Sequence, residues 1–129
     1  MAVQFINPPT LARGQHSHVA VVEGGRTIYL SGQVGADLKW QAVGNSFADQ
    51  VRQVFENLRA CLAAADASFS DIVKMNIYVV DLDAERVATF REIRNELFEK
   101  HRPASTLVDT RALVDPAFQI EIEAIAVIY

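Results

Sequence analysis

The chain has 129 residues, half of them hydrophobic, with a formal net charge of −4 and an isoelectric point near 5.3. This length predicts a single domain, residues 1–129, whose core needs no metal or disulfide to hold it together. The acidic balance argues against nucleic acid as a partner, because proteins that bind a phosphate backbone normally present a basic face.

The start of the chain and its cysteine content predict a cytoplasmic protein. Cys61 is the one cysteine, so no intrachain disulfide can form. The first residues lack the basic start and apolar run of a signal peptide. No apolar run approaches the roughly 20 residues that span a bilayer, so no membrane partner is expected.

Short extended segments dominate the first quarter of the chain. Apolar runs rich in β-branched residues predict strands at 3–6, 19–22 and 27–34. Gly24 and Gly25 separate the second run from the third. Two glycines between strands favour the left-handed conformations of a tight turn, so we expect a hairpin there.

Two later stretches have apolar residues spaced three and four apart, which is typical of an amphipathic helix. The first begins after Asn45 and is expected to end near Ala65, with Ser46 as its N-cap residue. The second covers 87–98, and Pro103 prevents it from continuing further.

Three further strands are predicted, at 72–80, 106–109 and 119–129. The order of elements predicts an α+β fold in which two helices pack on one face of a sheet of about six strands. Alternate residues of the last strand point to opposite faces, and both sets include apolar side chains. We therefore expect the helix-free face to be buried against other copies of the chain.

Six short segments together resemble the RidA/YjgF family, which also carries the older label L-PSP endoribonuclease. They run in the family's order: GQHSH at 14–18, LSGQV at 30–34, DIVK at 71–74, VVDL at 79–82, RPAS at 102–105 and IEIEAIAV at 120–127. The resemblance implies a chorismate-mutase-like sheet in a homotrimer, with ligand clefts between neighbouring subunits. It also implies hydrolytic deamination of small reactive enamines and imines to 2-oxo acids, with no cofactor.

The resemblance also places candidate site residues. Glu121 falls on the family's acidic position, where a carboxylate can hold the attacking water; alternatively it is a rim glutamate paired with an arginine at a subunit interface. Ser31 matches the cleft serine, or is a solvated hydroxyl at a strand end. His16 stands where many members have a tyrosine, and it either replaces that hydrogen-bond donor or is a loop histidine without a partner.

One position departs from the family pattern. Deaminating members carry an arginine directly after the Pro-Ala pair, which binds the substrate carboxylate through two hydrogen bonds; here Ser105 occupies that position. Arg102 is one replacement, although a capping charge at the end of the second helix is the competing interpretation. Arg111 is another candidate. Arg91 lies near a family asparagine, but the local spacing differs and its role is not transferred.

Two functions remain open. The first is an enzyme of the deaminase type with altered substrate preference, in which Glu121 handles water while Ser31 and Ser105 orient the ligand. The second is a non-catalytic module that binds or protects a small metabolite in the same cleft. Retention of Glu121 favours the enzyme, and loss of the arginine favours the module or a changed substrate. His16 and His18 are too few ligands for zinc, so no metal is expected.

Overall fold

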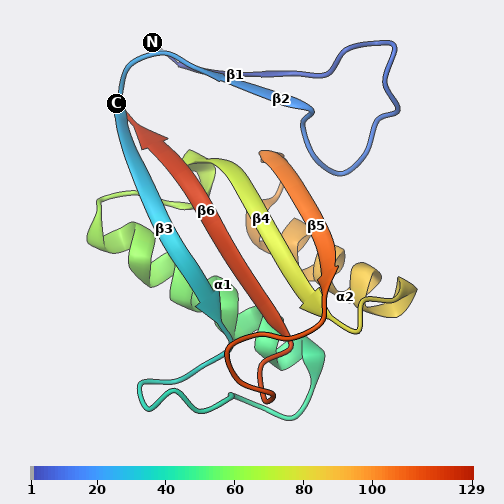
Figure 1. Cartoon of the computed structure of the whole chain (residues 1–129). Coiled ribbons are helices and arrows are strands. Elements are labelled where there is room, and N and C mark those ends of the chain that lie inside the picture. The colour runs from blue at the N-terminus through green and yellow to red at the C-terminus, as the bar shows by residue number, and fades with distance from the viewer. Residues whose placement is uncertain (1) are drawn as a thin grey trace.

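The computed structural model describes residues 2–129. The elements follow in the order β1 (Val3–Ile6), β2 (Val19–Val22), β3 (Arg26–Val34), α1 (Phe47–Ala64), η1 (Phe69–Asp71), β4 (Ile72–Val80), α2 (Ala84–Phe98), β5 (Ala104–Thr110) and β6 (Ile120–Ile128). Strands β3, β6, β4 and β5 form a mixed sheet in that order, and both helices cover one of its faces (Figure 1). The predicted α+β architecture is confirmed.

The sheet is antiparallel except at one edge. Strands β3 and β4 both pair antiparallel with β6, whereas β4 and β5 are parallel because α2 connects them. In residues 2–129, none of the helices has the length and apolar character needed to cross a membrane.

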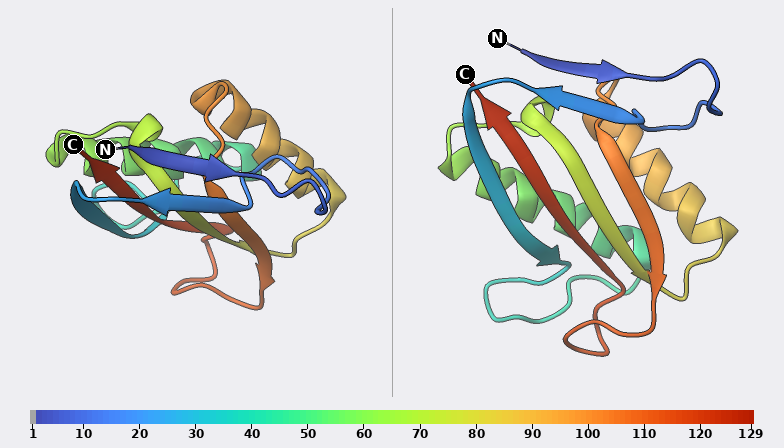
Figure 2. Two further views of the ribbon diagram at one scale, coloured as in Figure 1. Left: turned by 90° about the horizontal axis from the view of Figure 1, so that it is seen from above. Right: turned by 45° about the horizontal axis from the view of Figure 1, so that its top comes forward.

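The N-terminal strands are arranged differently from the prediction. Residues 2–129 contain six strands, but β1 and β2 form a separate antiparallel ribbon that crosses one end of the four-stranded sheet (Figure 2). The predicted hairpin between 19–22 and 27–34 is wrong, because β2 pairs with β1 and β3 pairs with β6. Gly24 and Gly25 do have positive φ angles, 65° and 76°. At Gly25 a side chain would collide with Val127 and the backbone of Ile128, so this glycine lets the chain cross the end of β6.

The core lies between the helices and the sheet. The apolar stripe of α1 is buried as predicted, and the hydroxyl of Ser46 accepts a hydrogen bond from the Asp49 amide at 3.0 Å. Four phenylalanine rings from both helices and η1 meet in this core: Phe55, Phe69, Phe90 and Phe98. Burial of these rings fixes how α1 and α2 pack on the sheet.

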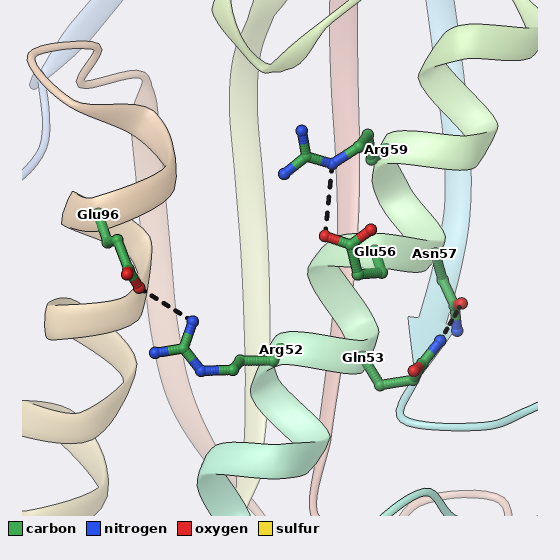
Figure 3. Close-up of polar contacts among 6 residues, drawn as sticks. All are labelled: Arg52, Gln53, Glu56, Asn57, Arg59 and Glu96. Atoms are coloured by element: carbon green, nitrogen blue, oxygen red, sulfur yellow. Dashed lines mark hydrogen bonds and ion pairs between the residues drawn. The ribbon is translucent and has the colours of Figure 1, made fainter.

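Several polar side chains on the outer surface of the helices contact one another (Figure 3). Arg52 of α1 and Glu96 of α2 form an ion pair at 2.9 Å, with side chains 54% and 60% exposed. Water screens such a pair, which contributes at most about 1 kcal/mol to stability. Asn57 has a larger structural role, since its amide donates to the carbonyls of Val34 and Ala36 and ties α1 to the end of β3.

The opposite face of the sheet is not covered by a helix (Figure 1). Residues Glu121, Glu123 and Ile125 of β6 point to it and are half-buried, and Val127 is buried. Tyr29 on β3 points the same way and is 78% exposed. Both faces of β6 therefore carry apolar side chains, as predicted, and the homotrimer stays a prediction.

Candidate functional site

Four of the candidate residues form two groups on opposite faces of the sheet, Glu121 with Ser31 and His16 with Ser105. Glu121 of β6 lies opposite Tyr78 of β4, on the helix-free face. Ser105 of β5 lies opposite Met75, which is fully buried beneath the helices. Because neighbouring residues in register share a face, Glu121 and Ser105 are on different sides of the sheet. One chain by itself does not bring them into a common site.

The first group forms where β3 is irregular. The pairing of β3 with β6 shifts register between Leu30 and Gln33, so Ser31 and Gly32 lie within a bulge. The carboxylate of Glu121 lies directly over Gly32, where any side chain would collide with its Oε1. Gly32 therefore makes the room that Glu121 occupies, and it brings Glu121 to the strand segment that also carries Ser31.

The carboxylates of Glu121 and Glu123 differ in their contacts. Glu121 makes no hydrogen bond or ion pair with residues 2–129, whereas Glu123 accepts hydrogen bonds from Asn76 at 3.1 Å and Tyr78 at 2.8 Å. Partial burial raises the pKa of Glu121, and the nearby charge of Glu123 raises it further. A carboxylate with a raised pKa and free acceptor oxygens is suited to take a proton from water.

A groove of about 290 Å³ lies beside this group on the helix-free face. Ser31, Tyr29, Lys74 and Glu123 are among its lining residues. The ammonium group of Lys74 donates to the hydroxyl of Thr106 at 2.8 Å, which holds that positive charge at the β4–β5 side of the face. Ser31 is exposed, so its hydroxyl is available to a ligand.

The second group lines a smaller pocket of about 160 Å³ between β5, α2 and the loop before β2. His16 and Ser105 both lie here. Two arginines of α2, Arg91 and Arg94, lie in the same pocket and were not predicted from the sequence. Arg94 follows the buried Ile93 on the apolar side of α2, and this charge at a buried position is the signal that could have revealed it.

Arg94 is only 4% exposed. Its guanidinium donates to the side-chain oxygens of Gln15 at 3.0 Å and Asn95 at 3.2 Å, and it lies over the Phe90 ring. Burial, followed by the positive charges of Arg102 and Arg91, lowers the pKa of Arg94 to about 10, so it is charged at neutral pH.

His16 lies in the same positive environment. Burial is the main cause that lowers the pKa of His16, and the charges of His18, Arg94, Arg91 and Lys74 lower it further. The imidazole is therefore neutral at pH 7, with one nitrogen as a donor and the other as an acceptor.

The remaining candidates lie elsewhere. Nη1 of Arg102 donates to the carbonyls of Glu99 at 2.6 Å and His101 at 2.9 Å, which is the capping interaction at the end of α2. Arg102 is not among the residues lining the pocket of Ser105, and Arg111 is exposed in the loop after β5. Within residues 2–129, no three or more histidine, cysteine, aspartate or glutamate side chains are grouped to hold a metal ion.

Comparison with known proteins connects this geometry to a family. The profile of the Endoribonuclease L-PSP family matches residues 8–128. The chain belongs to the RidA/YjgF family. It is 30% identical over 126 residues to the 2-iminobutanoate/2-iminopropanoate deaminase of Dermatophagoides farinae. The alignment covers 97% of this chain and 96% of that protein. The chain is 36% identical over 117 residues to the protein of the same name from Rattus norvegicus, covering 90% and 82%.

Solved structures show the same RidA/YjgF fold. The Rid-family protein YyfB of Yersinia pestis superposes with a TM-score of 0.92 at 31% identity, over 99% of this chain and 100% of that one. RidA of the Antarctic bacterium Psychrobacter sp. PAMC 21119 superposes with a TM-score of 0.73 at 34% identity, over 92% of both chains. The family predicted from the six motifs is confirmed. Within that family, this chain has Ser105 beside a pocket whose positive charge comes from α2.

Proposed function

We propose that this protein is a RidA-type hydrolytic deaminase that acts on a small enamine- or imine-type metabolite. Two relatives that align with most of the chain are named for the deamination of 2-iminobutanoate and 2-iminopropanoate. Replacement of the carboxylate-binding arginine by Ser105 alters the substrate preference relative to such deaminases. A cytoplasmic location fits this role, since the substrates are released by metabolic enzymes inside the cell.

The reaction needs a base for water and proton donors for the substrate. An enamine is first protonated at carbon to give the iminium ion. Glu121 then takes a proton from the water that attacks the iminium carbon, and the new carbon–oxygen bond gives a carbinolamine. The same carboxyl group returns the proton to nitrogen, the carbon–nitrogen bond breaks, and ammonia leaves. Loss of the hydroxyl proton completes the carbonyl group of the product.

The binding residues sit in two halves that one chain keeps apart. Glu121 and Ser31 belong to the helix-free face, while His16 and Ser105 belong to the pocket under α2. We therefore place the complete site between subunits of a homotrimer, where the first half of one subunit faces the second half of its neighbour. Arg102 contributes to ligand binding only if its capping bonds at the end of α2 are released.

The carboxylate of Glu121, which lies over Gly32 and has no partner among residues 2–129, carries this proposal. Glu121→Gln keeps the size of the side chain but removes its basicity. We expect turnover to fall by roughly 100-fold or more, the usual range for a lost general base, with assembly and ligand affinity nearly unchanged. The assay generates the imine with an amino-acid oxidase and follows its interception by semicarbazide. Glu56→Gln on the outer surface of α1 removes the same charge and serves as the control.

A non-catalytic metabolite-binding or protective trimer is the second candidate. Ser105 favours it, because a neutral hydroxyl cannot supply the two charge-assisted hydrogen bonds of the family arginine. In that case no imine would be hydrolysed faster than in buffer, and Glu121→Gln would change affinity alone. Disassembly of the variant would instead identify Glu121 as a structural residue at the interface.

A further inference from the structure

Arg94 is a buried positive charge, and the described part of the chain offers it no negative partner. On the outer surface of the helices, Arg52 and Arg59 each lie beside a glutamate (Figure 3). The much more deeply buried Arg94 has only the neutral oxygens of Gln15 and Asn95 as acceptors, and no carboxylate of residues 2–129 lies within ion-pair distance. Burying a charge costs free energy unless an opposite charge or several hydrogen bonds offset it. Three hydrogen bonds to neutral oxygens offset part of this cost for Arg94, and an anion in the adjoining pocket would supply the opposite charge.

The guanidinium still has donors to offer. Nε and Nη2 make the hydrogen bonds to Gln15 and Asn95, whereas Nη1 has no partner among residues 2–129. No fully buried side-chain nitrogen of these residues lacks a partner, so Nη1 reaches accessible space. Arg94 lines the pocket of His16 and Ser105, and Nη1 is the part of it that remains for a ligand.

Three neighbours complete an anion-binding set. Arg91 precedes Arg94 by three residues, so both side chains lie on the same side of α2. The Ser105 hydroxyl and the neutral imidazole of His16 add hydrogen-bond donors that need no counter-charge. The volume of about 160 Å³ has room for about five water-sized groups, which suits a carboxylate on a short carbon chain.

We propose that this pocket binds the carboxylate of a short 2-imino or 2-oxo acid, with Arg94 and Arg91 of α2 as the cations. In this proposal, two arginines of α2 supply the positive charge that the family arginine would supply from the position of Ser105 on β5. The carboxylate is thereby drawn toward α2, which changes which acids fit. The identity of the ligand rests on the proposed deaminase function, whereas binding of the anion does not require turnover.

A purely structural role for Arg94 makes a different prediction. In that role its bond to Gln15 only fastens the loop before β2 to α2, and Arg91, which is exposed and bonded to nothing in residues 2–129, would have no effect on any ligand. Arg91 is therefore the residue whose substitution separates the two roles without disturbing the fold.

Titration of the full-length protein with 2-oxobutanoate, followed by NMR or calorimetry, tests the pocket. Hydrogen bonds to a charged group are worth a factor of about 10 to 100 in affinity, so we expect Arg94→Gln and Arg91→Gln each to weaken binding, Arg94→Gln by more. Arg59→Gln removes the same charge from the outer surface of α1 and should bind like the wild type. The uncharged 2-oxobutanamide should bind wild-type protein at least about 10-fold more weakly than the acid.

Equal binding of the acid and the amide, absence of acid binding to the wild type, or wild-type affinity in Arg91→Gln would overturn the proposal. If Arg94→Gln does not fold, the affinity of Arg91→Gln and the comparison of the acid with the amide still show whether the pocket binds a carboxylate. The two proposals also fail separately. Tight acid binding without imine hydrolysis removes the deaminase and keeps the pocket, whereas hydrolysis unaffected by Arg91→Gln and Arg94→Gln removes the pocket and keeps the deaminase.

Discussion

On the helix-free face Glu121 and Glu123 stand two residues apart on β6, whereas beneath α2 Arg91 and Arg94 line the pocket that holds Ser105. The two glutamates are negative, with the positive charge of Lys74 at the β4–β5 side of their face, and the two arginines are positive. The pKa of Glu121 is raised by burial and by Glu123, and the pKa of Arg94 is lowered by burial and by other arginines. The two groups would stabilise each other if they met, but the sheet separates them within one chain.

This separation suits a substrate with two opposite charges. A 2-imino acid carries a negative carboxylate at one end and, when protonated, a positive iminium group beside it. The pocket under α2 matches the first charge and the carboxylate of Glu121 matches the second. Because the sheet separates the two groups within one chain, we expect the match to require two chains, so that assembly is a condition for the proposed activity.

The largest expected effect comes from breaking that assembly. Ile125→Glu adds a third carboxylate to the helix-free face beside Glu123, and burying this charge at an interface would cost several kcal/mol. We expect the wild type to sediment at about three times 14.3 kDa and the variant as a monomer without turnover. Ala60→Glu places the same charge on the exposed side of α1 and should remain assembled. A wild-type monomer, or a monomeric variant that still turns over, would show that one chain forms the whole site.

A smaller change sharpens the role of the acidic face. Gly32→Ala places a methyl group where the Glu121 carboxylate now lies, and the side chain must move away. We expect turnover to fall about 10- to 100-fold, as misplacement of a catalytic group by about 1 Å does. In a Glu121→Gln background the same change should cost almost nothing more, because both substitutions act through one carboxylate. Additive losses in the double variant would place the effect of Gly32 elsewhere.

The smallest expected effect is a shift of the pH profile. Because burial and Glu123 raise the pKa of Glu121, the acidic limb of kcat/KM should lie above the usual glutamate value of about 4.3 and disappear in Glu121→Gln. Stability should follow the same shift. A raised pKa in the folded state means that the contribution of Glu121 to stability is present at low pH and is lost as pH rises through that pKa. Urea unfolding of the wild type and of Glu121→Gln at several pH values checks whether this contribution falls as pH rises. An acidic limb of kcat/KM at or below about pH 4.3 would contradict the assignment of Glu121 as the base.

Local patterns in the sequence were sufficient for most of the elements. The predicted strands at 3–6, 19–22 and 72–80 coincide with β1, β2 and β4, and α1 begins after its predicted cap Ser46. The beginning of α2 at Ala84 was missed, because its cap, Asp83, precedes the apolar stripe that indicated the helix. Hydrophobic periodicity and helix capping depend on residues within a few positions of each other, so both can be recognised in the amino-acid sequence.

Tertiary structure alone decided three other features. The glycines at 24 and 25 have the positive φ angles expected of them, but the predicted hairpin does not form, because strand pairing depends on contacts far apart in the sequence. The close approach of the Glu121 carboxylate to Gly32 depends on a register shift between β3 and β6, which cannot be predicted from a local sequence pattern. The sequence places Arg94 as a charge among the apolar positions of the second helix, but it does not show what surrounds that charge. Arg94 is buried where no carboxylate of residues 2–129 reaches it, and whether a buried charge has a counter-charge depends on the three-dimensional arrangement of the chain.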